Sequence, residues 1–561
     1  MSTNSIQEEY NRWLNSISDN DLLNELKSMN ESQISDSFYR NLEFGTGGLR
    51  GVIGVGTNRM NIYVVAKATQ GLADYIINNF QEKDRVVAIS RDSRIKSDVF
   101  AECAASVLAA NSIKVMMYQD IAPVPMLSYA TRHLKCCMGV MITASHNPAK
   151  YNGYKVYNSD GCQITTKTAE EIYSYIEKID VLTGFKNISF EEGINKRLIS
   201  YIPSNVVDSF IDEIKKQSLL GNTKIDKNIS IVYSPLNGSG LMPVKRSLKE
   251  LGYTNIIIVK EQEQPDGNFP TCPYPNPEIK DALALGLEYC KKYHADLMLA
   301  TDPDCDRVGI AVRNNNGEYT LLSGNEVGIL LFDYVCSRRI ALGLMPKHPV
   351  MIKTIVTMDL AESIAKSYGV DVINVLTGFK FIGEQTGYLE KQGRGKDYIF
   401  GFEESYGYLT GTYVRDKDGV NGATMICEMF AYYKSLGISL LDKLNELWNK
   451  YGYCLNTLHS YEFPGEEGFN RMKQIMNFFR NEEVLIPKFV IKERQDYIHG
   501  LNGLPKADVI KFINDKGSIV LRPSGTEPKL KVYLSISAEN KEKALEIEKE
   551  LTNNIATLIY R

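Results

Sequence analysis

The amino-acid sequence predicts an α/β protein with three doubly wound mixed α/β domains plus a C-terminal α+β domain around a central cleft. Three observations predict this class. The 561 residues correspond, at roughly 150 residues per domain, to three or four domains. Short apolar runs alternate with helical patterns in three successive stretches, as in parallel α/β units. The last stretch instead combines a strand pair with an amphipathic helix.

This alternation predicts the elements of the three α/β units in order. The first unit is expected to contain strand 86–90, helix 98–110, strand 113–117, helix 126–133 and strand 138–142. The second is expected to contain strand 229–233, helix 243–251, strand 255–259, helix 279–293 and strand 296–300. A third unit runs from Val350 through Ile364 and Val372 to a strand at 398–402.

The C-terminal region has a different pattern. We expect a helix at 469–479, strands around Ser518 and at 531–535, and a final helix. In the final helix, apolar residues recur every three or four positions, at Ala544, Ile547, Leu551, Ile555 and Leu558. These patterns suggest four domains, at 1–195, 196–317, 318–456 and 457–561.

Composition excludes several classes of protein. Lys and Arg total 64 and Asp and Glu total 68, and the net charge of −4 argues against a nucleic-acid partner. No apolar run is long enough to span a membrane, and the first thirty residues lack the apolar core of a signal peptide. The ten cysteines include no CxxC pair, which is typical of reduced thiols. We therefore expect a cytoplasmic protein without a membrane partner.

The most informative loop is TASHNP at 143–148, directly after the predicted strand 138–142. Ligands of open parallel sheets gather where loops leave the carboxyl ends of strands. The loop would present the hydroxyl of Ser145, with Lys155 ten residues further on. A polar turn with a capping serine is the simpler alternative. No G-x-S-x-G elbow surrounds Ser145, which disfavours an esterase.

A second loop, TDPDCDR at 301–307, indicates a metal site. Asp302, Asp304 and Asp306 would repel one another unless a cation lies between them, and ligands that are all oxygen suit Mg²⁺ or Ca²⁺. An EF-hand is excluded, because its sixth position would be Arg307 instead of Gly and its twelfth Arg313 instead of Glu. A solvated acidic turn is the remaining alternative.

Two further loops suit sugar and phosphate groups. In GFEESYG at 401–407, Glu403 and Ser405 could bind sugar hydroxyls, although a solvated loop is as good an interpretation. In RPSGTEP at 522–528, an arginine, two hydroxyls and a glycine form a candidate phosphate nest, with an ordinary β-turn as the alternative. No Walker A motif is present, which disfavours a P-loop NTPase. Taken together, the four loops indicate Mg²⁺-dependent phosphoryl transfer involving a sugar phosphate.

The order of these loops resembles the α-D-phosphohexomutase superfamily. The resemblance extends from Gly45 to Tyr533, and all four loops occur in the superfamily's order. GTGGLRG at 45–51, GFEESYGYLTG at 401–411, VRDKDG at 414–419 and an N-terminal extension with EEYNRWL are most similar to type 2 phosphoglucomutases and phosphopentomutases. The resemblance implies a four-domain molecule with the active site in its central cleft.

The resemblance also implies residue roles. Ser145 would be the phosphoserine, and its Oγ would bind Mg²⁺ together with Asp302, Asp304 and Asp306. The other catalytic positions would be Arg50, His146, Lys155 and Lys417, with Lys155 as general base if its pKa is lowered. Substrate would contact Thr377, Gly378, Glu403, Ser405 and Arg307, and its distal phosphate Arg522, Ser524, Gly525 and Thr526. Glucose 1,6-bisphosphate would be the activating intermediate.

Several activities share this pattern. The leading expectation is interconversion of glucose 1-phosphate and glucose 6-phosphate. Phosphopentomutase and glucose 1,6-bisphosphate synthase are alternatives, a phosphomannomutase is less favoured, and a leaky phosphatase or a non-catalytic scaffold would retain the fold. Phe379 stands where many phosphoglucomutases have Trp, and Asn237 where related mutases often have His. The first departure weakens a strict assignment to glucose.

Overall fold

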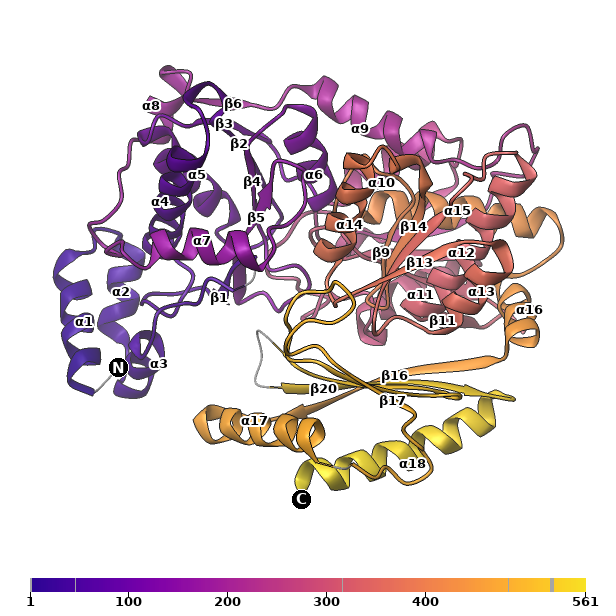
Figure 1. Ribbon diagram of the computed structural model, residues 1–561. Helices are drawn as coiled ribbons and strands as arrows, with labels where there is room; N and C mark the ends of the chain where they lie inside the picture. Colours follow the sequence, from indigo (N-terminus) through magenta and orange to yellow (C-terminus); the bar gives the residue numbers. More distant parts are fainter. Residues whose placement is uncertain (1–2, 46, 315, 483, 525–528) are drawn as a thin grey trace.

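The computed structural model describes residues 3–45, 47–314, 316–482, 484–524 and 529–561, and it contains four sheets in succession along the chain (Figure 1). The first three sheets each mix parallel and antiparallel pairs, and all pairs of the fourth are antiparallel. This confirms the expected class of three mixed α/β domains followed by an α+β domain.

The first sheet has the order β1-β5-β4-β2-β3-β6 and carries helices on both faces. Three N-terminal helices lie beside it, where the buried ring of Trp13 packs edge-to-face on Phe38 with ring centres 5.7 Å apart (Figure 1). The strands are β1 (Gly48–Val52), β2 (Val86–Arg91), β3 (Lys114–Met117), β4 (Met138–Ile142), β5 (Tyr151–Asn158) and β6 (Ile199–Tyr201). The helices are α1 (Thr3–Ser16), α2 (Asn20–Ser28), α3 (Glu31–Phe38), α4 (Ile62–Asn79), η1 (Glu82–Asp84), α5 (Ser97–Ala110), α6 (Val124–His133), α7 (Thr166–Ile176) and α8 (Phe190–Asn195).

The second sheet has the order β11-β10-β9-β7-β8, with β9 at its centre. All five residues of β9 are buried, as expected for a central strand with both faces covered. The strands are β7 (Ile231–Ser234), β8 (Ile256–Ile258), β9 (Leu297–Thr301), β10 (Val308–Arg313) and β11 (Tyr319–Leu322). The helices are α9 (Ser204–Lys216), α10 (Leu241–Glu250), η2 (Lys260–Gln262), η3 (Lys280–Leu283) and α11 (Ala284–Tyr293).

The third sheet has the order β13-β12-β14-β15 and shares one large apolar core with the second. Its strands are β12 (Val350–Thr354), β13 (Asp371–Val375), β14 (Tyr398–Glu403) and β15 (Gly407–Leu409). Its helices are α12 (Gly324–Ala341), α13 (Leu360–Tyr368), α14 (Phe379–Lys391), η4 (Gly395–Asp397), α15 (Gly419–Ser435) and α16 (Leu440–Tyr451).

The fourth sheet has the order β16-β20-β19-β18-β17, and α17 and α18 cover the face turned away from the other domains (Figure 1). The apolar stripe expected in the final helix lies in α18, where Ala544, Leu551 and Ile555 are buried. The strands are β16 (Tyr453–Glu462), β17 (Glu493–Asp496), β18 (Ile510–Asn514), β19 (Gly517–Pro523) and β20 (Lys529–Ala538). The helices are α17 (Gly465–Asn481) and α18 (Lys541–Tyr560).

Three details differ from the expectations. The short strand β6 lies beyond residue 195 but belongs to the first sheet, because it pairs in parallel with β3. Similarly, β16 begins at Tyr453, before residue 457, because its whole length pairs with β20. The expected helix at 279–293 starts as a 3₁₀ turn and becomes α-helical only from Ala284.

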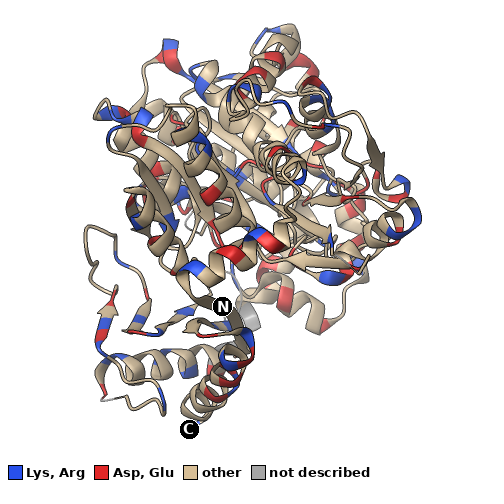
Figure 2. Cartoon of the chain, turned by 90° about the vertical axis from the view of Figure 1, so that its right-hand side faces the viewer, with Lys and Arg blue, Asp and Glu red and all other residues tan. Residues whose placement is uncertain are grey.

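Charged residues of both signs are interspersed on the helices. Figure 2 shows Lys and Arg mixed with Asp and Glu, in keeping with the net charge of −4. Among the described residues, no helix combines the length and the apolar character needed to cross a bilayer.

Candidate active site

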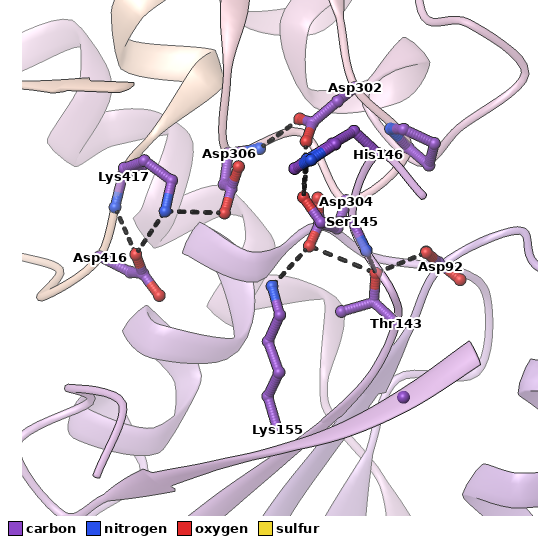
Figure 3. Close-up of polar contacts among 12 residues, drawn as sticks. Asp92, Thr143, Ser145, His146, Lys155, Asp302, Asp304, Asp306, Asp416 and Lys417 are labelled. Carbon is purple, nitrogen blue, oxygen red and sulfur yellow. Dashed lines mark hydrogen bonds and ion pairs between the residues drawn. The ribbon is translucent and has the colours of Figure 1, made fainter. Parts of the chain in front are cut away.

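Ser145 lies in the loop that leaves the carboxyl end of β4, in a strained backbone conformation. Its φ of +51° is in the left-handed region, which residues other than glycine rarely adopt. Thr143 Oγ1 stabilises the turn by accepting a hydrogen bond from the Ser145 N–H at 2.8 Å. The turn directs Ser145 Oγ to Asp302 Oδ2, 2.9 Å away in the second domain (Figure 3).

A buried arginine that the sequence analysis missed holds this loop in place. Arg94 follows β2 and donates hydrogen bonds to four backbone carbonyls of the loop and its exit, those of Ser145, Asn147, Pro148 and Tyr151. Asp92 Oδ2 lies 3.4 Å from Arg94 Nε and accepts a 2.6 Å bond from Thr143. Burial raises the pKa of Asp92 against the effect of Arg94. The sequence pattern that could have identified Arg94 is RDSR at 91–94. This segment lies at the carboxyl end of β2, the strand beside β4, where ligand-binding loops gather.

The three aspartates of the second loop form one cluster at the carboxyl end of β9. Carboxylate oxygens of Asp302, Asp304 and Asp306 all lie within 4.8 Å of one another, and all three residues are buried. Asp302 Oδ1 accepts hydrogen bonds from the N–H groups of Asp306 and Arg307, at 3.1 and 3.0 Å. The loop therefore curls around its first carboxylate and points the other two inward.

The electrostatics of the cluster are those of a cation site. Burial raises the pKa of Asp302 well above its ordinary value, and Asp306 and Asp304 raise it further. Burial also raises the pKa of Asp306, whereas at Asp304 the charges of Lys155 and Lys417, together with hydrogen bonds from Lys155 and Asp302, outweigh burial and lower the pKa. Asp304 Oδ1 and Asp306 Oδ1 are buried without a hydrogen-bond partner in the described part of the chain. Unpartnered oxygens of this kind fit Mg²⁺, a hard cation that prefers oxygen ligands.

Cations from two other domains surround the aspartates. Lys155 on β5 places its Nζ 2.9 Å from Asp304 Oδ2, and Lys417 places its Nζ 3.0 Å from Asp306 Oδ2 (Figure 3). Burial lowers the pKa of Lys417, but the charges of Asp306, Asp416 and Glu403 together outweigh burial and raise that pKa. Arg307 Nε lies 3.7 Å from Asp306 Oδ1, and its guanidinium is paired with Glu278. The structure thus brings together the predicted serine, aspartates and basic residues.

Arg50 and His146 complete the surroundings of the serine loop. Arg50 on β1 donates a 3.0 Å hydrogen bond to Asn147 Oδ1. His146 Nδ1 lies 3.2 Å from Ser145 Oγ. Burial, followed by the charges of Arg307 and Arg50, lowers the pKa of His146 well below its ordinary value. This imidazole is therefore neutral near pH 7 and adds no positive charge to the site.

The predicted sugar-binding residues form a second group, at the end of β14. Glu403 Oε1 accepts a 2.8 Å hydrogen bond from the N–H of Gly378. Burial raises the pKa of Glu403 to about 7, while Lys417 opposes the shift. Thr377 Oγ1 has no hydrogen-bond partner among the described residues, and Ser405 is partly exposed. These groups are placed to accept and donate hydrogen bonds to a polyol.

The predicted phosphate-binding loop begins at the end of β19. Arg522 is partly exposed at the end of this strand, and the N–H of Ser524 donates to Lys529 O at 2.8 Å. Lys380 in α14 lies across the boundary in the third domain. Its pKa is lowered to about 8, mainly by burial and in part by the charge of Arg522. Gly525 and Thr526 lie outside the described residues.

The two positions that depart from the family pattern, Phe379 and Asn237, are buried. Phe379 is 2% exposed, and its ring lies under Lys417 Nζ at 5.8 Å. The ring therefore packs against that lysine. Asn237 donates to the carbonyls of Gln264 and Glu261, at 2.8 and 3.3 Å, and thereby shapes its own loop. In that loop, Ser239 bonds Pro303 O at 2.7 Å and supports the aspartate loop.

Family models match most of the chain. The phosphoglucomutase/phosphomannomutase α/β/α domains I, II and III match residues 41–182, 208–317 and 323–451, and the C-terminal domain matches residues 483–553. The four matches follow one another in the order of the four sheets. The chain belongs to the phosphoglucomutase/phosphomannomutase family.

Curated relatives support the same assignment over nearly the full length. The chain is 36% identical over 557 residues to a phosphoglucomutase of Staphylococcus saprophyticus, covering 97% of this chain and 99% of the relative. It is also 36% identical over 539 residues to a phosphoglucomutase of Staphylococcus aureus strain MRSA252, covering 93% and 95%. These matches place the chain among the mutases, which are isomerases.

Solved structures share the fold at lower identity. A putative phosphomannomutase from Thermus thermophilus superposes with a TM-score of 0.69 at 20% identity, covering 93% of this chain and all of that one. The phosphoglucomutase parafusin from Paramecium, in an open form, gives 0.69 at 17%, covering 93% and 96%. These likenesses confirm the four-domain architecture.

Replacement of Arg94 is expected to destabilise the protein. In Arg94→Met, Asp92 would stay buried without its cation, and removal of one partner of a buried ion pair costs about 3–5 kcal/mol. Chemical denaturation should show this loss. Arg91→Met is the matched control, because Arg91 bonds carbonyls at 118–120 at the edge of the sheet and should cost less than about 1 kcal/mol. Equal losses in both variants would contradict the role assigned to Arg94.

Mg²⁺ is expected to stabilise the protein through the aspartate cluster. At a hundredfold excess over its dissociation constant, a bound ligand adds about 2.7 kcal/mol to the free energy of unfolding. Asp302→Asn should abolish the rise in melting temperature that Mg²⁺ causes in the parent protein. Asp333→Asn, at a buried carboxylate bonded to Tyr368, should leave that rise intact. A Mg²⁺ response retained by Asp302→Asn would contradict the site.

Sugar phosphate binding is expected to depend on the ionisation of Glu403. A carboxylate accepts hydrogen bonds from hydroxyls better than the neutral acid does. With a pKa of about 7, Glu403 is ionised above that pH, so KM should rise about tenfold between pH 8 and pH 6. Substrate phosphate also titrates in this range, and Glu403→Gln provides the reference. The ratio of the two KM values should therefore change with pH, and a constant ratio would exclude Glu403 as the cause.

Proposed function

We propose that this chain interconverts glucose 1-phosphate and glucose 6-phosphate through a phosphoserine at Ser145. The observation that carries the proposal is the 2.9 Å contact between Ser145 Oγ and a buried cluster of three carboxylates with unpartnered oxygens. The phosphoglucomutase names of relatives at 36% identity support glucose phosphates as substrates. The ten free cysteines, nine of them buried, support a cytoplasmic location.

The proposed reaction consists of two phosphoryl transfers. In the first, the bond between phosphorus and Ser145 Oγ breaks, and a hydroxyl oxygen of the bound sugar monophosphate forms a new bond to phosphorus. The hydroxyl proton passes to a base, for which Lys155 is the candidate, and Ser145 takes up a proton. The bisphosphate then reorients, and its other phosphoryl group returns to Ser145 Oγ with the opposite proton movements. Glucose 1,6-bisphosphate is thus both the intermediate and the activator.

The residues around Ser145 stabilise the charge that moves with the phosphoryl group. Asp302, Asp304, Asp306 and Ser145 Oγ would hold Mg²⁺, which supplies positive charge to the phosphoryl oxygens. Lys417 and Arg307 add fixed cations from the third and second domains, and Arg50 holds Asn147 of the serine loop. Ser145 is 3% exposed, which limits the access of water to the phosphoester.

Substrate orientation falls to the other two loops. Glu403, Ser405, Thr377 and Gly378 would bind the sugar hydroxyls. Arg522, Ser524, Gly525 and Thr526 would bind the phosphate that is not being transferred, for which an arginine beside hydroxyls and backbone N–H groups is suited. Because glucose 1-phosphate and glucose 6-phosphate must both bind, these sugar and phosphate contacts have to accept the sugar in either orientation.

A competition assay followed by ³¹P NMR tests the proposal. Glucose 1-phosphate, mannose 1-phosphate and ribose 1-phosphate are supplied at equal concentrations with Mg²⁺ and catalytic glucose 1,6-bisphosphate. We expect the glucose ester to be consumed fastest, with glucose 6-phosphate as product. Preferential loss of the ribose ester would identify a phosphopentomutase instead, and release of free phosphate a phosphatase.

The phosphoserine itself is tested by substitution. Ser145→Ala should lower turnover by at least about 10³-fold, because the group that carries the phosphoryl is lost. The control Ser209→Ala removes a partly exposed hydroxyl of α9, which bonds Asn205 O, and should retain full activity. Mass spectrometry of the parent protein should locate phosphate on Ser145, and its presence on another residue would contradict the mechanism.

A further inference from the structure

A cavity lies away from the aspartate cluster, where the first three domains meet. It has a volume of about 780 Å³, within the range of small-molecule sites. Its walls come from α6 of the first domain, the end of α9 in the second, and α12, α14 and the loop after β15 in the third. None of the described residues assigned to the catalytic or substrate-binding site lines it.

The walls of this cavity carry an excess of positive charge. Four cationic side chains line it, Arg132, Lys216, Arg339 and Lys396, against the two carboxylates Glu213 and Glu390. Glu390 is already paired with Arg132 at 3.2 Å and with the buried guanidinium of Arg415. Glu213 is paired with Lys216 at 2.8 Å. The negative charges of both carboxylates are therefore compensated by ion pairs. The positive charges of Arg339 and Lys396 are left without a carboxylate of the cavity wall to compensate them.

Arg339 is the most informative of these cations. No ion pair joins it to a carboxylate among the residues that the structure describes, and its Nε is buried without a hydrogen-bond partner. Burial lowers the pKa of Arg339. The neighbouring Arg338, in contrast, donates to the carbonyls of Leu219 and Leu220, both at 3.1 Å. A partly buried guanidinium without a carboxylate partner favours a ligand that supplies an anion.

The cavity is connected to the catalytic site by one chain segment. Gly411, Thr412 and Tyr413 line the cavity, and the same segment continues to Lys417, which pairs with Asp306. Between them, the backbone N–H of Arg415 donates to Ser128 Oγ of α6 at 2.9 Å, which fastens the segment to the first domain. The first residue of α6, Val124, donates its N–H to Asp304 O at 3.0 Å.

We propose that this interdomain cavity is a binding site for a small phosphorylated polyanion, held by Arg339 and Lys396 with Arg132 and Lys216 at its edge. A guanidinium pairs with phosphate oxygens in a bidentate manner, and the ammonium groups add point charges. The bound anion joins three domains and orders the segment from Gly411 to Lys417. The site differs from the phosphate-binding loop at Arg522, which belongs to the fourth domain.

Isothermal titration of the full chain with inorganic pyrophosphate tests the proposal without using catalysis. We expect binding that survives Arg522→Met, which weakens phosphate binding at the catalytic site. The double variant Arg339→Met/Lys396→Met should weaken this binding at least tenfold. The control Arg313→Met/Lys249→Met removes the same two charges from exposed positions on β10 and α10 and should bind as the parent does.

Hydrogen exchange provides the second readout. Pyrophosphate should slow exchange in the segment 411–417 of Arg522→Met, and the cavity variant should lose this protection. ATP and fructose 1,6-bisphosphate, titrated in parallel, distinguish a nucleotide from a sugar bisphosphate as the preferred ligand. Binding that disappears in Arg522→Met, or that is unchanged in the cavity variant, would overturn the proposal. Neither result bears on whether Ser145 carries the phosphoryl group.

Discussion

The arrangement of this molecule depends on the repulsion among three buried aspartates. At separations below 5 Å, two ionised carboxylates repel by roughly 3–4 kcal/mol at an effective dielectric constant of 20. Asp302, Asp304 and Asp306 are each almost wholly buried, so solvent does little to reduce the repulsion between their carboxylates. The cluster is tolerable only with positive charge close by. Part of that charge comes from lysines, and the oxygens without partners leave room for a metal ion.

That requirement explains why the domains meet where they do. The first domain contributes Lys155 from β5, and the third contributes Lys417 from the segment after β15. Each lysine compensates a different aspartate of the second domain. A change in how these domains pack would therefore separate charges that need one another, and the electrostatics of the site stabilise the interdomain arrangement. The apolar core shared by the second and third domains then holds the pairing in register.

The sequence predicted the elements that have strong local patterns. The buried strands β4 and β9 and the loops after them were predicted because apolar runs end at polar residues at the carboxyl ends of strands. The contacts between loops were not predictable, since Ser145 and Asp302 are 157 positions apart. Arg94 was missed for a related reason. Arg94 donates hydrogen bonds to four carbonyls that only the folded loop brings together. The sequence alone does not show which groups an arginine near a strand end will bond.

The supporting residues also explain how the site can be both enclosed and accessible. Ser145 and the aspartates are buried, whereas Ser405, Thr377 and Arg522 are partly exposed. In the proposed reaction, the groups that exchange the phosphoryl are thus kept from water. Ser405, Thr377 and Arg522, proposed to contact the sugar and its second phosphate, lie nearer to solvent, whereas Glu403 is buried beside them. The bisphosphate of the proposed reaction, which has to turn end over end, needs this division. Its reacting end requires a dry, rigid surrounding, while its other end needs contacts that can be broken and remade at small cost in free energy.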